Sequence, residues 1–304
     1  MYKKHFGLNT KPFSLLSDPG FLYFSDKHKT AFTILEYGLM EQTGITVITG
    51  EVGSGKTTLV NHLMNRVSSD ELTLGVINNT HQLMGTLLQL IALAFNVEHE
   101  GLDSVALFKS LQTYFLDEYA AGRRVVLIVD EAQNMNENAL EELRMLTNIN
   151  SGTDQLLQLI LVGQPELFDM LTQHRMRQFA QRVSSEYHLK ALGRKETNSY
   201  IHSRTKRAGA EQHLFEKAAT TLIFYFSGGV PRLINALADE ALVHAYAMDV
   251  KIVSFAIVLE SVKNKRIGGI QRFGIKSRDS EKTRELLEKM TGVDVVEALQ
   301  KKSA

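Results

Sequence analysis

The most informative residues of this 304-residue chain are Gly50-Glu51-Val52-Gly53-Ser54-Gly55-Lys56-Thr57, which fit G-x-x-x-x-G-K-[ST] at every fixed position. They follow an apolar, β-branched run, Ile45–Thr49, and open a helical stretch, Lys56–Val67. Glycines let the backbone N–H groups of such a loop turn inward around an anion, and the helix N-terminus adds partial positive charge. The alternative, a glycine-rich turn without chemical significance, is disfavoured by this strand–loop–helix context.

The loop predicts a binding site for a nucleoside triphosphate. Lys56 is expected to reach the β- and γ-phosphates, and the Thr57 hydroxyl is expected to ligate Mg²⁺. We therefore take all eight residues, together with Thr58, as candidate nucleotide-binding residues.

A pair of carboxylates, Asp130-Glu131, comes directly after a second apolar run, Val125–Val129. Ligands of parallel sheets bind at the carboxyl ends of the strands, which is where the loop must also lie. Asp130 is expected to hold Mg²⁺ through its water shell, and Glu131 to polarise an attacking water as general base. Taken alone, Asp130-Glu131 is equally well a solvated loop start, and its pairing with the loop favours the catalytic interpretation.

Two further residues are candidates for contact with the γ-phosphate. Gln164 follows the strand predicted at Leu156–Val162, where it either senses phosphate and attacking water or caps the helix that begins at Pro165. Arg232 lies in the first turn of a helix that Pro231 opens, at the end where the helix dipole disfavours a cation. Either a ligand phosphate or a carboxylate partner explains it, and we favour phosphate.

Three arginines, Arg175, Arg177 and Arg182, cluster before the last predicted strand. One of them is a candidate arginine finger that reaches the nucleotide of a neighbouring subunit and stabilises charge in the transition state. Arg177 and Arg182 are the two candidates that we retain. A surface salt bridge is expected for at least one of the three.

The hydrophobic pattern alternates between buried strands and helices. Strands are predicted at Ile45–Thr49, Leu72–Ile77, Arg124–Val129, Leu156–Val162 and Ser185–Leu189; helices at Ser25–Gln42, Lys56–Val67, Leu83–Phe95, Ser104–Tyr119, Glu137–Thr147 and Glu166–Gln173. This order predicts an α/β domain at residues 25–192, with a parallel sheet covered by helices on both faces.

The flanking regions are predicted to differ from this domain. Residues 1–24 form an irregular N-terminal arm, interrupted by Pro12 and Pro19. A small all-helical lid domain follows at residues 193–264, with helices at Lys195–Arg207, Glu211–Tyr225, Pro231–Ala247 and Ser254–Asn264. The third helix carries a clear apolar stripe. Residues 265–304 are expected to form a basic, flexible, poorly packed tail with one or two short helices.

Composition excludes several classes of function. Lys+Arg and Asp+Glu both number 34, so no global charge draws the chain to nucleic acid or acidic lipid. The chain has no cysteine, which excludes disulfides and thiol chemistry. The longest apolar run is far shorter than the roughly 20 residues of a membrane span, and the N-terminal residues have no signal-peptide character. We expect a cytoplasmic location.

Together these motifs resemble the AAA+ superfamily. Gly50–Thr57 matches its Walker A motif, Asp130-Glu131 its Walker B motif, Gln164 its sensor 1 position and Gly229-Val230-Pro231-Arg232 its sensor 2. More narrowly, the chain is similar to bacterial ATPases of the general secretion pathway protein A type. That likeness is carried by His5-Phe6-Gly7-Leu8, Pro12-Phe13, Asp18-Pro19, Phe21-Leu22-Tyr23, Asp130-Glu131-Ala132-Gln133-Asn134, Glu141-Glu142-Leu143-Arg144-Met145-Leu146 and Leu161-Val162-Gly163-Gln164-Pro165-Glu166-Leu167.

The resemblance implies ATP as the nucleotide, with Mg²⁺, and a homo-oligomeric ring or helix as the active state. It implies a role in assembling or regulating a cell-envelope secretion, pilus or polysaccharide-export system. It also makes Phe6, Pro12 and Phe13 candidates for contact with adenine. Members of the secretion type often continue into a membrane helix and a periplasmic domain, and we expect neither from the residues of this sequence. We therefore expect it to meet membrane machinery from the cytoplasmic side, peripherally at the inner membrane.

A local basic stretch keeps a second interpretation open. Residues 263–278 contain six cationic residues and no acidic one: Lys263, Lys265, Arg266, Arg272, Lys276 and Arg278. Such a stretch is either simply solvated or binds the phosphates of DNA or of lipid headgroups. Similar ATPases regulate transposition as filaments on DNA, so a DNA-binding ATPase switch is the alternative function. A nucleotide-binding scaffold that rarely turns over is a third.

Overall fold

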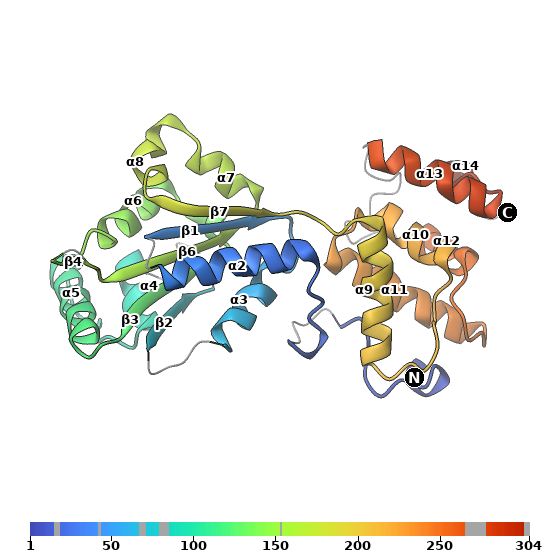
Figure 1. The fold of residues 1–304 in the computed structure, drawn as a ribbon, viewed down its shortest axis with the longest axis horizontal. Coiled ribbons are helices and arrows are strands. Elements are labelled where there is room, and N and C mark those ends of the chain that lie inside the picture. Colours follow the sequence, from blue (N-terminus) through green and yellow to red (C-terminus); the bar gives the residue numbers. More distant parts are fainter. Residues whose placement is uncertain are drawn as a thin grey trace. The chain divides into compact units, whose positions relative to one another are not determined.

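The computed structural model describes residues 1–14, 19–41, 44–66, 71–78, 85–152, 154–264 and 278–300 (Figure 1). The chain divides into two compact units, which we call the sheet unit and the helical unit. The sheet unit comprises Asp26–Glu51 and Lys56–Leu189, and the helical unit comprises Met1–Ser25, Val52–Gly55 and Lys190–Ala304.

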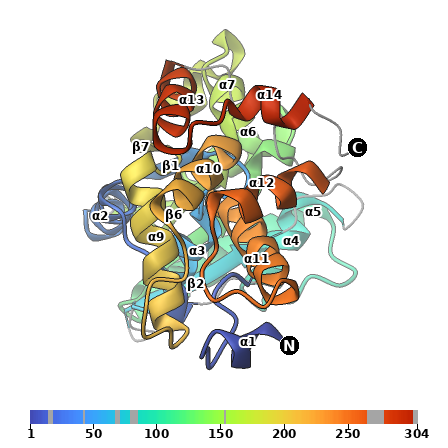
Figure 2. The same cartoon turned by 90° about the vertical axis from the view of Figure 1, so that its right-hand side faces the viewer.

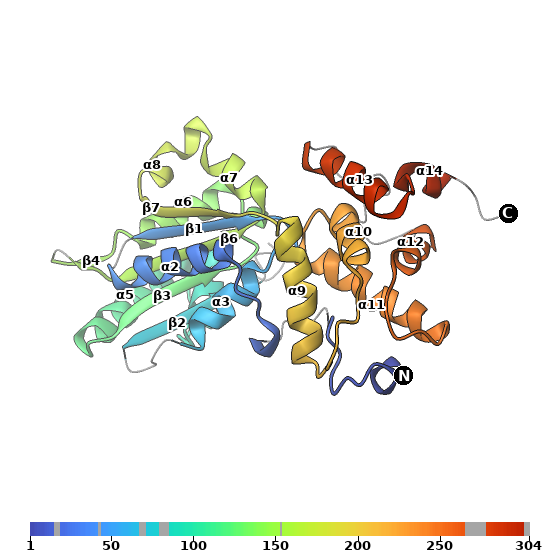
Figure 3. The same cartoon turned by 45° about the vertical axis from the view of Figure 1, so that its right-hand side comes forward.

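Five parallel strands form the sheet, in the order β2-β3-β6-β1-β7 (Figure 3). Their bounds are β1 (Ile45–Gly50), β2 (Leu72–Ile77), β3 (Arg124–Val129), β6 (Leu157–Gly163) and β7 (Val183–Leu189). The three central strands are buried along nearly their whole length, as expected of β-branched and leucine-rich runs covered on both faces. The predicted parallel sheet is confirmed, and each predicted strand is present within about two residues of its expected bounds.

Helices pack on both faces of the sheet. Those of the sheet unit are α2 (Asp26–Met40), α3 (Lys56–Met64), α4 (Leu87–Ala94), α5 (Ser104–Ala120), η3 (Ala132–Asn134), α6 (Glu137–Leu146), α7 (Pro165–Leu171), η4 (His174–Met176) and α8 (Arg177–Ala180). Helices α2 and α3 contact β1, β6 and β7, whereas the buried side chains of α4 to α8 share one core with alternate residues of the strands. Thr86, Asp103 and Asn136 cap α4, α5 and α6, which fixes where these helices begin.

Two short strands, β4 (Asn150–Ser151) and β5 (Asp154–Gln155), were not predicted. These strands pair antiparallel, and each is only two residues long. Strands of this length carry no hydrophobic periodicity, so the sequence gives no signal for them.

The helical unit has its own apolar core, and Figure 2 labels most of its helices. Its elements are α1 (Tyr2–His5), η1 (Pro19–Phe21), α9 (Arg194–Arg207), α10 (Lys217–Ser227), α11 (Pro231–Ala247), α12 (Phe255–Asn264), α13 (Arg278–Thr291) and α14 (Val295–Gln300). The apolar stripe expected on α11 faces this core, where Ile234, Leu237 and Leu242 are completely buried. None of the described helices combines the length and apolar character required to span a bilayer.

Two segments of the helical unit differ from expectation. Helix α10 begins at Lys217 rather than Glu211, because Phe215 forms a parallel bridge with Val253 and its neighbours take extended backbone hydrogen bonds there. The tail is not poorly packed over its described part, since Leu287 of α13 and Val295 of α14 are fully buried in the core. Each residue belongs to a short apolar pair between charged residues, Leu286-Leu287 and Val295-Val296, so the sequence pattern understated their burial.

The N-terminal arm is held to the helical unit by a buried arginine. Arg204 of α9 donates from Nε to the carbonyl oxygen of Pro12 at 2.6 Å and from Nη1 to the Tyr200 hydroxyl at 2.9 Å. Its guanidinium also lies 5.0 Å from the centroid of the Phe21 ring. The Tyr200 hydroxyl in turn donates to Asn235 of α11. Carbonyl, hydroxyl and aromatic partners thus solvate this buried cation, and they tie the arm to two helices.

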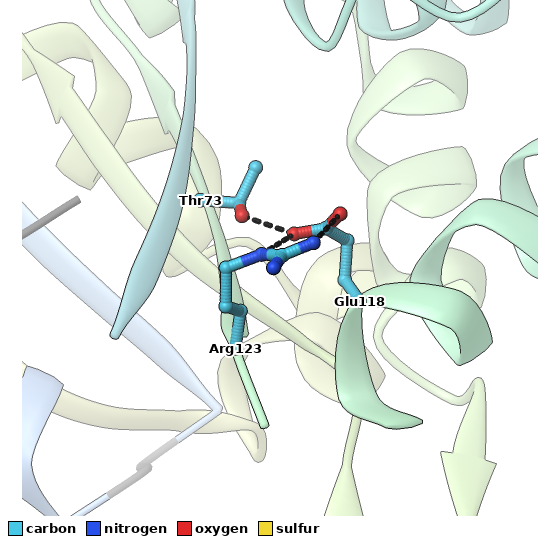
Figure 4. Close-up of polar contacts among 3 residues, drawn as sticks. All are labelled: Thr73, Glu118 and Arg123. Atoms are coloured by element: carbon cyan, nitrogen blue, oxygen red, sulfur yellow. Dashed lines mark hydrogen bonds and ion pairs between the residues drawn. The ribbon is translucent and has the colours of Figure 1, made fainter. Parts of the chain in front are cut away.

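In the sheet unit, the carboxylate of one residue joins three elements (Figure 4). Glu118 of α5 accepts two hydrogen bonds of 2.7 Å from Arg123, which precedes β3, and one from the Thr73 hydroxyl on β2. The bonds from Arg123 are the main reason that the pKa of Glu118 is lowered, and Thr73 acts in the same direction against the effect of burial. A bidentate pair of this kind fixes both side chains.

Replacing this carboxylate should destabilise the fold in a pH-dependent way. We expect Glu118→Gln to lower the free energy of unfolding by about 1–3 kcal/mol at pH 7, because charged hydrogen bonds are lost. A lowered carboxyl pKa in the folded state stabilises above the unfolded pKa of about 4.3, so the difference between variant and parent should shrink below that pH. Urea unfolding measures both, with Asp117→Asn, an exposed neighbour, as the control. Equal losses for both variants would contradict the assignment.

Candidate functional site

The phosphate-binding loop connects β1 to α3 and has the backbone that the motif predicts. Gly53 and Gly55 have φ values of +77° and +103°, which side chains rarely adopt. A Cβ atom on Gly53 would lie 2.3 Å from Cβ of Arg232, so this position also needs glycine for space. Ser54 is buried, whereas Glu51 and Val52 are exposed.

Lys56, the first residue of α3, is buried and turned back into the loop. Its ammonium donates to the carbonyl oxygens of Gly50 at 2.7 Å and of Glu51 at 3.0 Å. Burial lowers the pKa of Lys56, and the charges of Glu131 and Asp130 oppose that shift. A buried cation held by neutral carbonyls is well suited to anionic phosphate oxygens.

Thr57 and Asp130, the two predicted magnesium ligands, are joined by a hydrogen bond. The Thr57 hydroxyl donates to Oδ2 of Asp130 at 2.6 Å, and Oδ1 of Asp130 accepts from the backbone N–H of Glu131. Hydroxyl and carboxylate oxygens are the ligands that Mg²⁺ prefers, and the described residues contain no group of three or more His, Asp or Glu side chains that would hold a metal alone. The pair therefore fits an ion that is completed by phosphate and water. Such an ion would neutralise charge on the phosphates.

Glu131 lies at the start of the turn after β3 with φ of +53°, an uncommon backbone conformation for a residue with a side chain. Its Oε2 accepts hydrogen bonds from Nε2 of Gln133 at 2.6 Å and from Nε2 of Gln164 at 3.1 Å. Burial alone would raise the pKa of Glu131, but these two bonds and the charge of Lys56 together lower it. The carboxylate is thus held ionised, as a proton acceptor must be.

Gln164 occupies the position before α7, but its side chain does not cap that helix. It points to Glu131 instead, because β6 pairs directly with β3 in the sheet. Of the two interpretations left open by the sequence, capping by this side chain is therefore wrong. Gln133 is a residue that sequence reasoning missed, and the available signal was an amide two positions after Glu131 in a turn.

Arg232 lies in the first turn of α11, directly after Pro231, as predicted. Its backbone N–H donates to the carbonyl oxygen of Gly53 at 3.2 Å, so within the helical unit it sits on the tip of the loop. No carboxylate pairs with its exposed guanidinium in the described part of the chain. Phosphate as its partner stays a prediction.

The three clustered arginines are placed differently. Arg175 forms an ion pair of 2.6 Å with Glu137, so the expected surface salt bridge is present. Arg177 is exposed and lines a cavity of about 520 Å³ between α7, α8 and β7. Arg182 is half-buried just before β7. Across the described ranges neither Arg177 nor Arg182 has an ion-pair partner, and both stay candidates for the finger.

The residues predicted to contact adenine are packed within the helical unit. Phe6 and Phe13 are buried in the core of the helical unit, where Phe13 packs edge-on against Phe215, and the carbonyl oxygen of Pro12 accepts from Arg204. Their contact with adenine stays a prediction that this packing does not require. In the basic stretch, Lys263 lies in the last turn of α12. Residues 265–277 lie outside the described residues, and Arg278 is described only by its backbone.

Comparison with known proteins agrees with this geometry. A family model described as an AAA domain matches residues 39–171. The chain is also 40% identical over 250 residues to general secretion pathway protein A of Aeromonas hydrophila, an alignment that covers 81% of this chain and 45% of that protein. The chain therefore contains an AAA domain and is related to general secretion pathway protein A. It spans about half the length of the curated relative that it matches.

Solved structures support the AAA+ fold over nearly the whole chain. The ORC1 protein of Aeropyrum pernix, solved in complex with DNA, has a TM-score of 0.59 at 16% identity and covers 95% of this chain and 85% of its own. Cdc6p of Pyrobaculum aerophilum has a TM-score of 0.59 at 15% identity, covering 91% of this chain and 85% of its own. At such low identity the likeness between this chain and these proteins is one of fold.

Removing the loop lysine should weaken nucleotide binding. We expect Lys56→Ala to lower the affinity for ATP with Mg²⁺ by tenfold or more, because a charge-assisted contact to phosphate is lost. Isothermal titration calorimetry measures the change, and Lys109→Ala, an exposed lysine on α5, is the matched control. Parental affinity in Lys56→Ala would show that the loop does not bind phosphate in this way.

Proposed function

We propose that the protein hydrolyses ATP with Mg²⁺ by in-line attack of a water that Glu131 polarises as general base. The observation that supports this most directly is the convergence of Lys56, the Thr57–Asp130 pair and Glu131 at one edge of the sheet unit. Little covalent chemistry is required of the protein in phosphoryl transfer, so positioning and charge stabilisation account for the rate.

Each residue has one task in this scheme. Lys56 binds and neutralises the β- and γ-phosphates, and the backbone N–H groups of Gly53–Thr58 surround them. Thr57 and Asp130 hold the magnesium ion. Gln164 keeps the carboxylate of Glu131 aimed at the water and responds to loss of the γ-phosphate.

The helical unit is proposed to respond to the γ-phosphate of the nucleotide through Arg232. The loop tip Val52–Gly55 groups with this unit, and Arg232 contacts the loop at Gly53. A guanidinium placed there would change partner when the γ-phosphate leaves, so hydrolysis would be coupled to rearrangement of α11.

We further propose that this ATPase works as a homo-oligomer that drives or regulates assembly of a cell-envelope secretion, pilus or polysaccharide-export system from the cytoplasmic side. The support is the identity of 40% to general secretion pathway protein A. ATP hydrolysis stimulated by duplex DNA in a salt-dependent manner would instead favour the DNA-binding switch.

Glu131→Gln tests the general base. The substitution keeps the size of the side chain and removes its capacity to accept a proton, so we expect phosphate release to fall by a factor of about 100 or more while ATP still binds. Single-turnover phosphate release and calorimetry separate the two effects. Glu142→Gln, an exposed glutamate on α6, controls for loss of charge. An unchanged rate in Glu131→Gln would favour the nucleotide-binding scaffold.

Mixed oligomers test the arginine finger. Glu131→Gln subunits keep their arginines but lack the base, whereas Arg177→Ala subunits keep the base. If Arg177 acts on the neighbouring subunit, mixing the two inactive proteins should restore part of the activity, because some interfaces combine an intact finger with an intact site. The same mixture with Arg182→Ala distinguishes the candidates, and Arg175→Ala is the control. Failure of both mixtures to recover activity would exclude a finger at either position.

A further inference from the structure

Gln133 connects the candidate base to the start of α7. Its Nε2 donates to Oε2 of Glu131 at 2.6 Å, and its Oε1 accepts from the backbone N–H of Gln164 at 3.0 Å. One amide therefore links the turn after β3 with the end of β6. Gln164 adds a second bond to the same carboxylate oxygen through its side chain.

The orientation of the Gln133 amide follows from chemistry. A backbone N–H only donates, so the group facing Gln164 must be the oxygen of Gln133, and the NH₂ group must face Glu131. Gly163 leaves the space for this arrangement, because a Cβ atom there would lie 3.1 Å from Oε1 of Gln133 and 2.7 Å from Cδ2 of Leu167. The two hydrogen-bond partners thus fix the orientation of the amide.

We infer that Gln133 is a positioning residue for ATP hydrolysis, one that fixes the direction of the Glu131 carboxylate and makes it depend on the start of α7. The inference rests on the proposed role of Glu131 as general base. Because the backbone of Glu131 is in the left-handed region, its side chain leaves the turn in an unusual direction, and Gln133 and Gln164 hold it there. Movement of α7 would then redirect the base without any change in the phosphate-binding loop.

Two substitutions separate this role from simple support of the turn. Gln133→Met keeps the length of the side chain and removes both hydrogen bonds. Gln133→Glu keeps an acceptor for the N–H of Gln164, removes the donor to Glu131 and places a second carboxylate beside Glu131 that repels it, so it remains informative if Gln133→Met unfolds. Asn134→Met, at the exposed neighbouring position, is the matched control.

Both Gln133 variants are expected to lower kcat by about tenfold or more while the affinity for ATP stays within about twofold of the parent, because Glu131 is no longer held in its direction whereas the residues of the phosphate-binding loop are unchanged. In a Glu131→Gln background, Gln133→Met should cause no further loss of the single-turnover rate, since Gln133 acts through Glu131. A merely structural residue would lower the melting temperature and ATP affinity together and would give additive losses.

The outcomes distinguish this inference from the proposed function. If Glu131→Gln turns over like the parent, the general base is assigned wrongly. If Glu131→Gln is inactive while the Gln133 variants hydrolyse ATP at the parental rate, or if the losses in the double variant are additive, only the role of Gln133 is overturned.

Discussion

The parallel pairing of β1 with β6 and of β6 with β3 is the constraint on which the candidate site depends. Thr49 lies opposite Gly163, and Val129 lies opposite Leu161, so the three strands end at one edge of the sheet. Lys56, Asp130-Glu131 and Gln164 all follow one of these strand ends closely. A register slip of one residue would exchange the two faces of a strand, and because both faces are buried, the side chains would no longer match the helices packed on either side.

Electrostatics at this edge are arranged around Lys56. The ammonium is buried among carbonyl oxygens and has Asp130 and Glu131 nearby, so the cation and the carboxylates that the proposed chemistry needs lie together at this edge of the sheet. Fixed charges and dipoles of this kind need little rearrangement when phosphate is bound. Charge placement therefore explains more of the proposed activity than any single reactive side chain.

In the helical unit, long-range polar contacts define where the arm and the loop tip lie. Arg204 bonds the arm at Pro12, and the close approach of Gly53 to Arg232 requires glycine in the loop. The glycine of the phosphate-binding motif thus serves backbone conformation and packing together. This explains why the tip of the loop groups with the helices that follow the sheet.

The amino-acid sequence alone was sufficient for the strands, most helices, the phosphate-binding loop and the Asp130-Glu131 pair, because these depend on short-range periodicity and on neighbours within a few residues. Tertiary structure decided which side chains meet across the sheet: the bonds of Gln133 and Gln164 to Glu131, the later start of α10 and the burial of Leu287. These depend on partners from elements distant in the chain. The local hydrophobic pattern encodes the helices and strands, whereas the contacts between their side chains are fixed only when these helices and strands pack together.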